Sequence, residues 1–325
     1  MKKGRNGQIS CRGSVVRSAF RKPALSLLLL LGFLVQLHAA PPAPVVAVSI
    51  LPQTEFVTKI AGSKVKLLSL VGPGASPHNY EPSPRQMADL SKASLWLTVG
   101  VEFENALLPK IRALYPRLKV VNSAEGVRYR QMETEHGHDE VEGQELGQDH
   151  SEGSADADGH DQGGLDPHVW LGFDAVKVQL AITLKALCAL LPEEKTFFEA
   201  NYKAYLAQMD EVQKTLARDL APMKGGTVFV YHPFFGYFLD AFGIRQEAVE
   251  LGGKEPTQKN LALLIAKAKE EGARVIFVQK QFSTAAARTV ASAIGGAVVE
   301  IDPLAPAWLD NVKVMGKALM QSSGR

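Results

Sequence analysis

Three histidines stand at places in the sequence where a side chain could bind a metal ion. The chain has eight histidines, and three of them lie beside prolines at the boundaries of structured stretches: His78 in "GPGASPHNYEPSP", His168 in "LDPHVWLGFD" and His232 in "VFVYHPFFGYF". Neutral imidazole is the commonest metal ligand in proteins, and the neighbouring prolines restrict the local backbone. A single histidine of this kind is more often an ordinary polar residue, so the hypothesis of a metal site depends on the three converging.

A fourth candidate ligand is Asp302, which ends an apolar stretch in "VEIDPLAP". Three imidazoles and one carboxylate form a four-coordinate set that suits Zn²⁺, at Zn–N distances of roughly 2.0–2.1 Å. Mn²⁺ prefers more oxygen ligands, whereas Cu²⁺ and Ni²⁺ could bind the same set as tightly, so the ligand types favour zinc without excluding those ions. Carboxylates usually hold the second ring nitrogen of such histidines, and Asp166 and Glu81 are the candidates for that role.

Residues 131–164 form a low-complexity stretch that contains four more histidines. It has eleven acidic residues, no Lys or Arg, and only Val141 and Leu146 as branched aliphatic residues, so it cannot bury enough surface to offset the entropy of ordering it. We therefore expect a disordered loop. One interpretation of this loop is a solubilising insertion whose histidines are incidental. The other is a weak collector of zinc, because histidine-rich acidic tracts bind metals; its ligands would be His136, His138, His150 and His160.

The strands and helices that must position these residues are expected to form two similar halves. The first half has short apolar strands that alternate with amphipathic stretches typical of helices. The second half repeats that order, and its helical stretches end in glycine. The expected strands are Val45–Ile50, Val65–Gly72, Leu95–Gly100 and Leu118–Ala124 in the first half, and Thr227–Phe234, Arg245–Leu251, Val275–Lys280 and Ala297–Leu304 in the second.

This alternation predicts the α/β class, with two similar lobes that each contain a parallel sheet flanked by helices. We expect a first lobe over residues 45–190 and a second over 225–322. Residues 193–222 lack Gly and Pro until Pro222, and they predict one long helix of roughly 40 Å that joins the lobes. The first helix is expected to begin with Thr54 as its cap.

The predicted sheets suggest how distant histidines could meet. Ligands bind beyond the carboxyl ends of the strands in open parallel sheets. His78 and His232 follow strands of opposite lobes, and Asp302 ends the last strand. The sequence therefore predicts a site in the cleft between the lobes.

The N-terminus predicts export. Of the 36 Lys and Arg, seven lie in residues 1–40, which contain no Asp or Glu; the other 29 basic residues face 34 acidic ones, for a net charge of about −5. An apolar run, Ala24–Leu37, and small residues follow the basic segment, which is the order of a secretory signal peptide. We expect cleavage near Ala39 or Ala40 and a periplasmic product. The remainder shows no basic face for nucleic acid.

Sequence motifs for enzymatic functions or nucleotide binding are weaker. "HGHDE" at His136–Glu140 is superficially similar to a metallohydrolase motif, and a secreted zinc-dependent hydrolase is the alternative function. However, that motif has no preceding strand to position it, and no H-E-x-x-H occurs. "LGGKEPT" lacks the spacing of a phosphate-binding loop. We expect neither catalytic residues nor a bound organic cofactor.

The four motifs "GPGASPHNYEPSP", "DPHVWL", "YHPFFGYF" and "EIDPLAP", in that order and behind a signal peptide, resemble those of the cluster A-I solute-binding proteins of metal-uptake ABC transporters. The resemblance covers residues 45–322 and is strongest to the zinc-specific branch, the ZnuA and TroA-like proteins. It implies that His78, His168 and His232 hold a metal in the cleft. Asp302 matches a fourth ligand of many members, whereas others use water or another acid.

The resemblance also implies a biological role. We expect a monomer that captures Zn²⁺ one to one, closes slightly, and delivers the ion to an ABC transporter permease; a periplasmic zinc chaperone is a further candidate partner. Manganese-specific relatives usually carry Glu where this chain has His232, and a histidine-rich loop before His168 is typical of the zinc branch. A manganese-binding protein or an adhesin of the same family is the remaining alternative.

Overall fold

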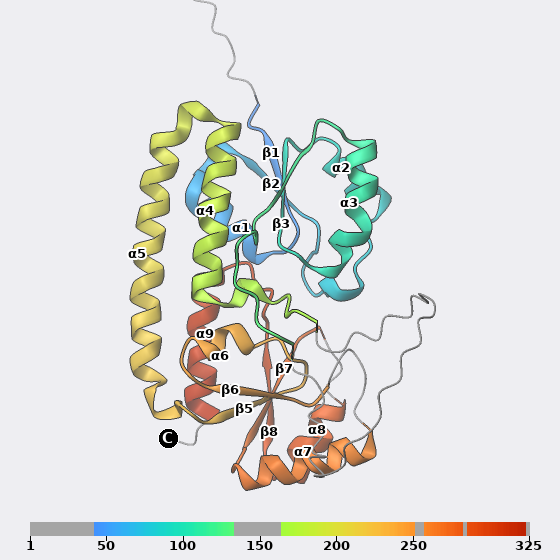
Figure 1. Ribbon diagram of the computed structural model, residues 1–325, viewed down its shortest axis with the longest axis vertical. Helices are drawn as coiled ribbons and strands as arrows, with labels where there is room; N and C mark the ends of the chain where they lie inside the picture. Colours follow the sequence, from blue (N-terminus) through green and yellow to red (C-terminus); the bar gives the residue numbers. More distant parts are fainter. Residues whose placement is uncertain (1–41, 133–163, 251–256, 282–284, 323–325) are drawn as a thin grey trace, which may run out of the picture. The chain divides into compact units, whose positions relative to one another are not determined.

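The computed structural model describes residues 42–132, 164–250, 257–281 and 285–322. Ala43–Arg325 form one compact unit, and Figure 1 shows its helices and strands. None of the helices within the described ranges has the length and apolar character that crossing a bilayer requires. The predicted signal peptide, its cleavage site and the four histidines of the low-complexity stretch lie outside the described residues.

The first sheet has four parallel strands in the described part of the chain, in the order β2-β1-β3-β4. The central strands β1 and β3 are almost wholly buried, as expected for a parallel sheet with helices on both faces. All four predicted strands are confirmed, with shorter bounds: β1 Val45–Val48, β2 Lys66–Ser69, β3 Leu95–Thr98 and β4 Lys119–Asn122.

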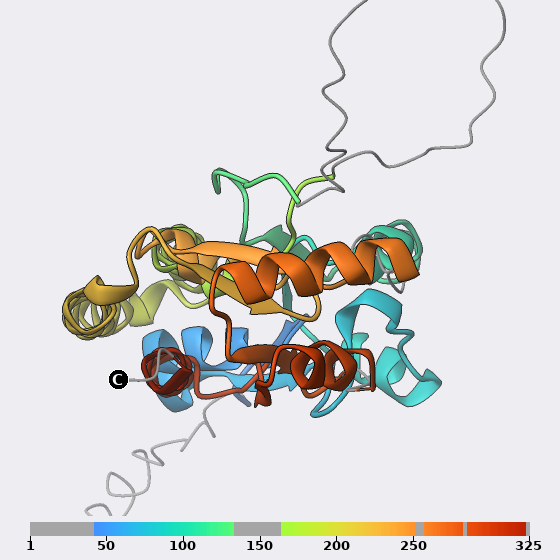
Figure 2. The same cartoon turned by 90° about the horizontal axis from the view of Figure 1, so that it is seen from below.

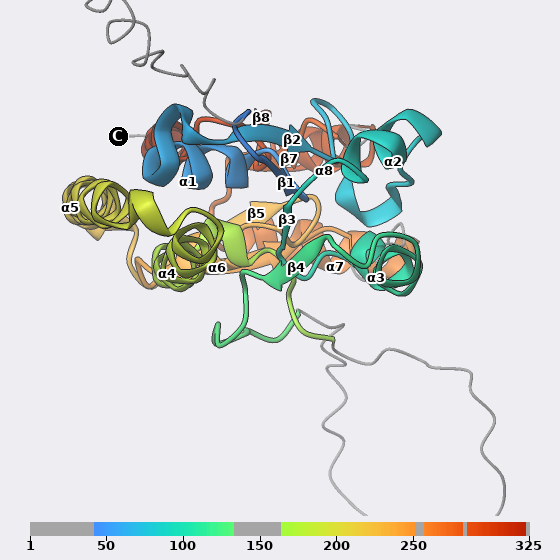
Figure 3. The same cartoon turned by 90° about the horizontal axis from the view of Figure 1, so that it is seen from above.

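Helices cover both faces of this sheet. α1 and α4 lie on one side and α2 and α3 on the other (Figure 3). Ser83 and Gln86 form a capping box at the start of α2, which satisfies backbone donors that have no partner within the helix. The bounds are α1 Pro52–Ala61, α2 Pro84–Leu90, α3 Glu102–Leu114 and α4 Phe173–Leu190.

The predicted cap of the first helix is wrong. α1 begins at Pro52, and the hydroxyl of Thr54 donates to the carbonyl of Leu51 instead of accepting from the backbone. Proline suits the first helical position because its fixed φ matches the helix and it has no N–H that needs a partner.

The second sheet repeats the first in topology, with four described parallel strands in the order β6-β5-β7-β8. α7 and α8 lie on one side of it (Figure 2), and α6 and α9 lie on the other. The elements are β5 Thr227–Val230, α6 Gly236–Asp240, β6 Arg245–Ala248, α7 Gln258–Glu270, β7 Val275–Gln279, α8 Ala285–Ala293, β8 Ala297–Ile301 and α9 Trp308–Ser322.

A long helix, α5 (Lys195–Asp219), joins the two halves, as predicted, although it is shorter than residues 193–222. It packs against α1 and α4 of the first half and against α9 of the second. The main apolar core extends along the same path, because it contains Val46 from β1, Met209 from α5 and Leu319 from α9. The α/β fold with two similar lobes is thus confirmed, and the lobes share a core. The exact domain boundaries stay a prediction.

Candidate metal centre

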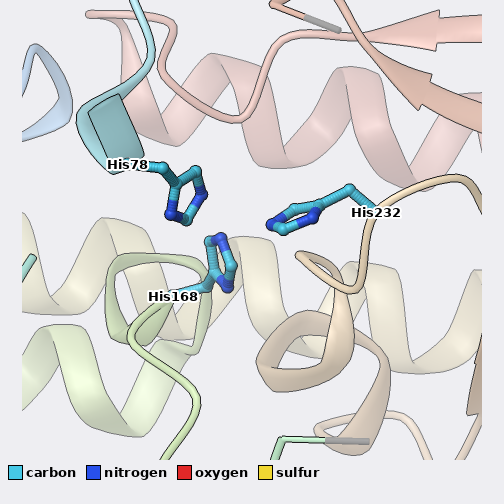
Figure 4. Close-up of side chains that lie close together, drawn as sticks. All are labelled: His78, His168 and His232. Carbon is cyan, nitrogen blue, oxygen red and sulfur yellow. The ribbon is translucent and has the colours of Figure 1, made fainter. Parts of the chain in front are cut away.

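The three candidate histidines meet. His78, His168 and His232 each offer one ring nitrogen, and these atoms all lie within 4.8 Å of one another. Figure 4 shows the rings pointing toward one another from three separate segments. Their ring centroids are 4.9 Å apart for His78 and His232 and 5.3 Å apart for the other two pairs. Around a tetrahedral ion, the nitrogens would lie roughly 3.4 Å from one another. The distances between them would therefore have to shorten by at most about 1.5 Å for all three to bind one ion.

His78 belongs to a short 3-10 turn, η2 (Pro77–Asn79), in the connection after β2. Proline occupies the first position of the turn, and the hydroxyl of Ser76 accepts a hydrogen bond from the His78 N–H at 3.3 Å. The side chain of His78 is 23% exposed. It is therefore the member of the group that solvent reaches most easily, since His168 and His232 are buried.

His168 stands directly before a second 3-10 turn, η3 (Val169–Leu171). Two tryptophans fix this turn against the segment after β8. The Trp170 indole N–H donates to the carbonyl of Pro303 at 3.0 Å, and the Trp308 indole N–H donates to the carbonyl of Trp170 at 2.6 Å. A histidine from the first half of the chain is thereby held against the second half.

His232 follows the end of β5, at the carboxyl edge of the second sheet. The backbone after the strand is fixed by a bond from Tyr231 N to the carbonyl of Phe277 and by one from Phe234 N to the carbonyl of His232. His232 thus lies at a strand end, as predicted, whereas His78 lies in a 3-10 turn of the longer connection that follows β2.

A carboxylate contacts the Nδ1 atom of each histidine. Glu102 lies 2.9 Å from His78, Asp166 lies 2.8 Å from His168, and Glu250 lies 2.9 Å from His232. An ionised carboxylate only accepts hydrogen bonds, so each pair places the ring proton on Nδ1 and makes Nε2 the unprotonated nitrogen. Metal-binding histidines are commonly oriented in this way.

The prediction of Asp166 as such a partner is confirmed, whereas that of Glu81 is wrong. Glu81 is exposed, and Glu102, the first residue of α3, holds the His78 ring instead. Glu102 and Glu250 were missed. The signal that could have found them is their position shortly after the carboxyl end of a strand, β3 for Glu102 and β6 for Glu250, because ligands bind at that edge of a parallel sheet.

Burial favours a neutral ring at His232, and the surroundings of Asp166 and Glu102 favour ionised carboxylates. Burial lowers the pKa of His232. The bond to Glu250 opposes this shift, and the two nearby imidazoles add to it. Burial alone would raise the pKa of Asp166, but the charge of His168 and bonds from His168 and Arg130 outweigh it, so the pKa is lowered. The pKa of Glu102 is also lowered, because the bond and charge of His78 outweigh burial.

The orientation of the buried nitrogens fits a metal ion. Nε2 of His168 is buried without a hydrogen-bond partner, and Nε2 of His232 is buried as well. A buried polar atom without a partner is costly and calls for an explanation, and coordination of a cation at the meeting point of the rings would supply one.

Asp302 is not part of this group of described residues. Its Oδ1 atom accepts bonds from the side-chain amide of Gln281 and from the N–H of Leu304, both at 3.0 Å. Its assignment as a fourth ligand stays a prediction, and it requires the carboxylate to give up part of this bonding.

Comparison with known proteins places these features in a family. The profile described as "Zinc-uptake complex component A periplasmic" matches residues 46–320. A crystal structure of ZnuA is similar to this chain, with a TM-score of 0.75 and 31% identity, and the match covers 86% of this chain and 99% of that one.

Curated relatives of this chain also have names that refer to zinc. A high-affinity zinc uptake system protein ZnuA of Yersinia pestis is 28% identical over 264 residues, which cover 80% of this chain and 82% of the relative. A zinc-binding lipoprotein AdcA of Streptococcus pneumoniae is 29% identical over 257 residues, or 78% of this chain. The match spans 48% of that relative, so this chain corresponds to about half its length.

Proposed function

The chain belongs to the family of periplasmic zinc-uptake components, and on that premise we propose that it binds Zn²⁺ outside the cytoplasm with His78, His168 and His232 and delivers it to the permease of an ABC transporter. Zinc is the cargo in this proposal. The observation that carries it is the convergence of three ring nitrogens, all within 4.8 Å of one another, from segments far apart in the chain.

The donor set supports zinc over manganese. Three imidazoles with no carboxylate oxygen in the group suit Zn²⁺, whereas Mn²⁺ favours oxygen ligands. The carboxylates of Glu102, Asp166 and Glu250 contact the far side of each ring, so negative charge surrounds the cation without binding it directly. The fourth position is proposed for Asp302 or a water molecule.

A binding role fits the site better than hydrolysis. The zinc hydrolase alternative requires a lasting open position for an activated water and a nearby general base. The carboxylates of Glu102, Asp166 and Glu250 are instead each engaged by a histidine ring. We propose a non-enzymatic protein, and assays with generic ester, peptide and lactam substrates test this, since turnover that depends on bound zinc would contradict it.

The histidine-rich stretch is proposed as a weak, multi-site collector for the central site, through His136, His138, His150 and His160. Deleting residues 132–163 should leave tight binding at the three histidines intact and slow zinc acquisition at low supply. Unchanged uptake under zinc starvation would contradict the collector role.

The remaining parts of the proposal concern location and partners. We propose that the signal peptide is removed near Ala39 or Ala40, and that the product is a periplasmic monomer that contacts the permease and a zinc chaperone. N-terminal sequencing of the exported protein tests the cleavage position. Cross-linking of the zinc-loaded protein to the permease in membranes tests the delivery partner.

The direct test of the binding function is calorimetric titration of the metal-free protein with Zn²⁺ and, separately, with Mn²⁺. One zinc ion should bind per chain, far more tightly than manganese. Absence of tight zinc binding, or a preference for manganese, would contradict the proposal.

A further inference from the structure

Arg130 connects the metal centre to a helix of the second lobe. Its Nη1 lies 2.9 Å from Oδ2 of Asp166, and its Nε lies 3.1 Å from Oδ2 of Asp240, at the end of α6. The side chain of Asp166 is fully buried, while that of Asp240 is 55% exposed. One guanidinium therefore joins a buried carboxylate at the metal centre to a carboxylate at the surface.

The two oxygens of Asp166 have separate tasks. Oδ1 accepts from both the N–H and the Nδ1 of His168, at 2.9 and 2.8 Å. Oδ2 accepts from Arg130. Because both ends of the carboxylate are held, its plane is fixed, and the fixed plane in turn sets the orientation of the His168 ring.

Residues of α6 surround Arg130 and leave space for its guanidinium. At Gly236, the first residue of α6, a Cβ atom would lie 1.8 Å from Nη1 of Arg130, so a larger residue there would force the guanidinium to move. The hydroxyl of Tyr237 accepts from the N–H of Arg130 at 3.1 Å and donates to the carbonyl of Asp166 at 3.0 Å. The backbones on both sides of the ion pair are thus tied to α6.

These contacts lead to one inference. We propose that Arg130 is a positioning residue for the metal centre, which holds Asp166 so that Nε2 of His168 stays aimed at the meeting point of the three rings. This inference rests on the proposed zinc-binding function. A guanidinium is suited to the task because its planar fork can bond two carboxylates at once, which the single ammonium group of lysine does less well.

Loss of the Arg130 side chain should disturb the metal centre through Asp166. The aspartate would stay buried but lose the partner of Oδ2, and a buried carboxylate without its ion-pair partner is costly. The carboxylate would then rotate, and the His168 ring with it. Loss of groups that orient metal ligands typically weakens metal affinity by about 10–100-fold.

The test compares Arg130→Gln with Arg128→Gln in the full chain, by titrating zinc against a chelator of known affinity. Arg128 is exposed and lies two residues away, so both variants lose one positive charge. Arg130→Gln should weaken zinc binding by about 10–100-fold, and Arg128→Gln should leave it unchanged. Arg130→Lys should recover part of the loss.

Gly236→Ala is a second variant that keeps the arginine. The added methyl group would displace the flexible end of the Arg130 side chain, so this variant should weaken zinc binding to a similar extent. Because both changes remove the same contact, the double variant Arg130→Gln/Gly236→Ala should bind zinc no more weakly than the worse single variant.

A spectroscopic readout separates positioning from a general structural role. In the zinc-free protein, the ¹⁵N shifts of the His168 ring, assigned by comparison with His168→Ala, should move in Arg130→Gln and stay in place in Arg128→Gln. Equal zinc affinity of wild type and Arg130→Gln, or unmoved His168 signals, would overturn the inference. Failure of the wild-type protein itself to bind zinc would instead overturn the proposed function.

Discussion

Nδ1 of His232 lies 2.9 Å from Oε2 of Glu250, and both side chains are buried. His232 follows β5, and Glu250 follows β6, the strand that pairs with β5. The parallel arrangement brings both strand ends to one edge of the sheet, so the glutamate reaches the ring from the adjacent strand. This contact orients Nε2 of His232 toward the other two histidines.

Replacing Glu250 tests whether this contact matters for binding. Glu250→Gln removes the charge that favours a proton on Nδ1, and zinc affinity should fall by about 10-fold or more. Competition with a chelator measures the change. Glu300→Gln is a matched control, since Glu300 is exposed on β8; an equal loss in both variants would contradict a specific role for Glu250.

Zinc binding should depend on pH through the histidines. A histidine must be neutral to bind a metal ion, and the pKa of His232 is lowered from 6.5, mainly by burial. Its ring therefore stays neutral below the pH at which a free histidine takes up a proton. Zinc affinity should be nearly constant above about pH 7. It should fall in more acidic solution, where protons compete with the metal for the ring nitrogens, and the lowered pKa of His232 delays its share of that loss. Calorimetry at pH 7.5 and pH 5 checks this, and equal affinities would reject histidine coordination.

A separate pH effect should come from Glu104, a buried residue in the first turn of α3. Its carboxylate accepts the N–H of Val99 at 2.9 Å and of Gly100 at 2.8 Å, and burial raises its pKa from 4.5 to about 7. The folded state therefore binds this proton more tightly than the unfolded state. The resulting stabilisation is complete below about pH 4.5 and is lost as the pH rises through about 7.

Glu104→Gln isolates that effect. Between pH 5 and pH 8, the free energy of unfolding of the wild type should fall relative to that of the variant by on the order of 2 kcal/mol. Urea unfolding of both proteins at the two pH values measures the difference, and all other groups titrate equally in both. A difference between the proteins that does not change with pH would contradict the raised pKa.

Metal preference should depend on the ligand at position 232. His232→Glu supplies an oxygen ligand, which manganese favours. Because the new carboxylate would face Glu250, the change is best combined with Glu250→Gln to avoid repulsion between two buried acids. The ratio of zinc to manganese affinity should fall relative to Glu250→Gln alone, as titrations with each metal would show. An unchanged ratio would argue against coordination by residue 232.

The sequence alone predicted the fold class and the three histidines, but less of what surrounds them. Alternation of strands and helices is a local pattern, so both sheets could be expected. His78 and His232 were found because strand ends mark ligand sites, and Asp166 was found because it lies two residues before His168.

The glutamate partners could not be chosen from the sequence, because they depend on which strands become neighbours. Glu81 is near His78 in the chain, yet Glu102 at the start of α3 reaches the ring. The bonding of Asp302 to Gln281 likewise depends on side-chain orientation, which periodicity does not encode. Position in the chain was therefore a good guide to strand ends and a poor guide to contacts between segments.

The central claim is that three imidazoles form one tight zinc site. Its most direct test is the zinc content of the purified protein after dialysis, measured by elemental analysis beside the triple variant His78→Ala/His168→Ala/His232→Ala. About one zinc ion per chain should remain on the wild type and essentially none on the variant. Equal zinc content in the two proteins would contradict the account.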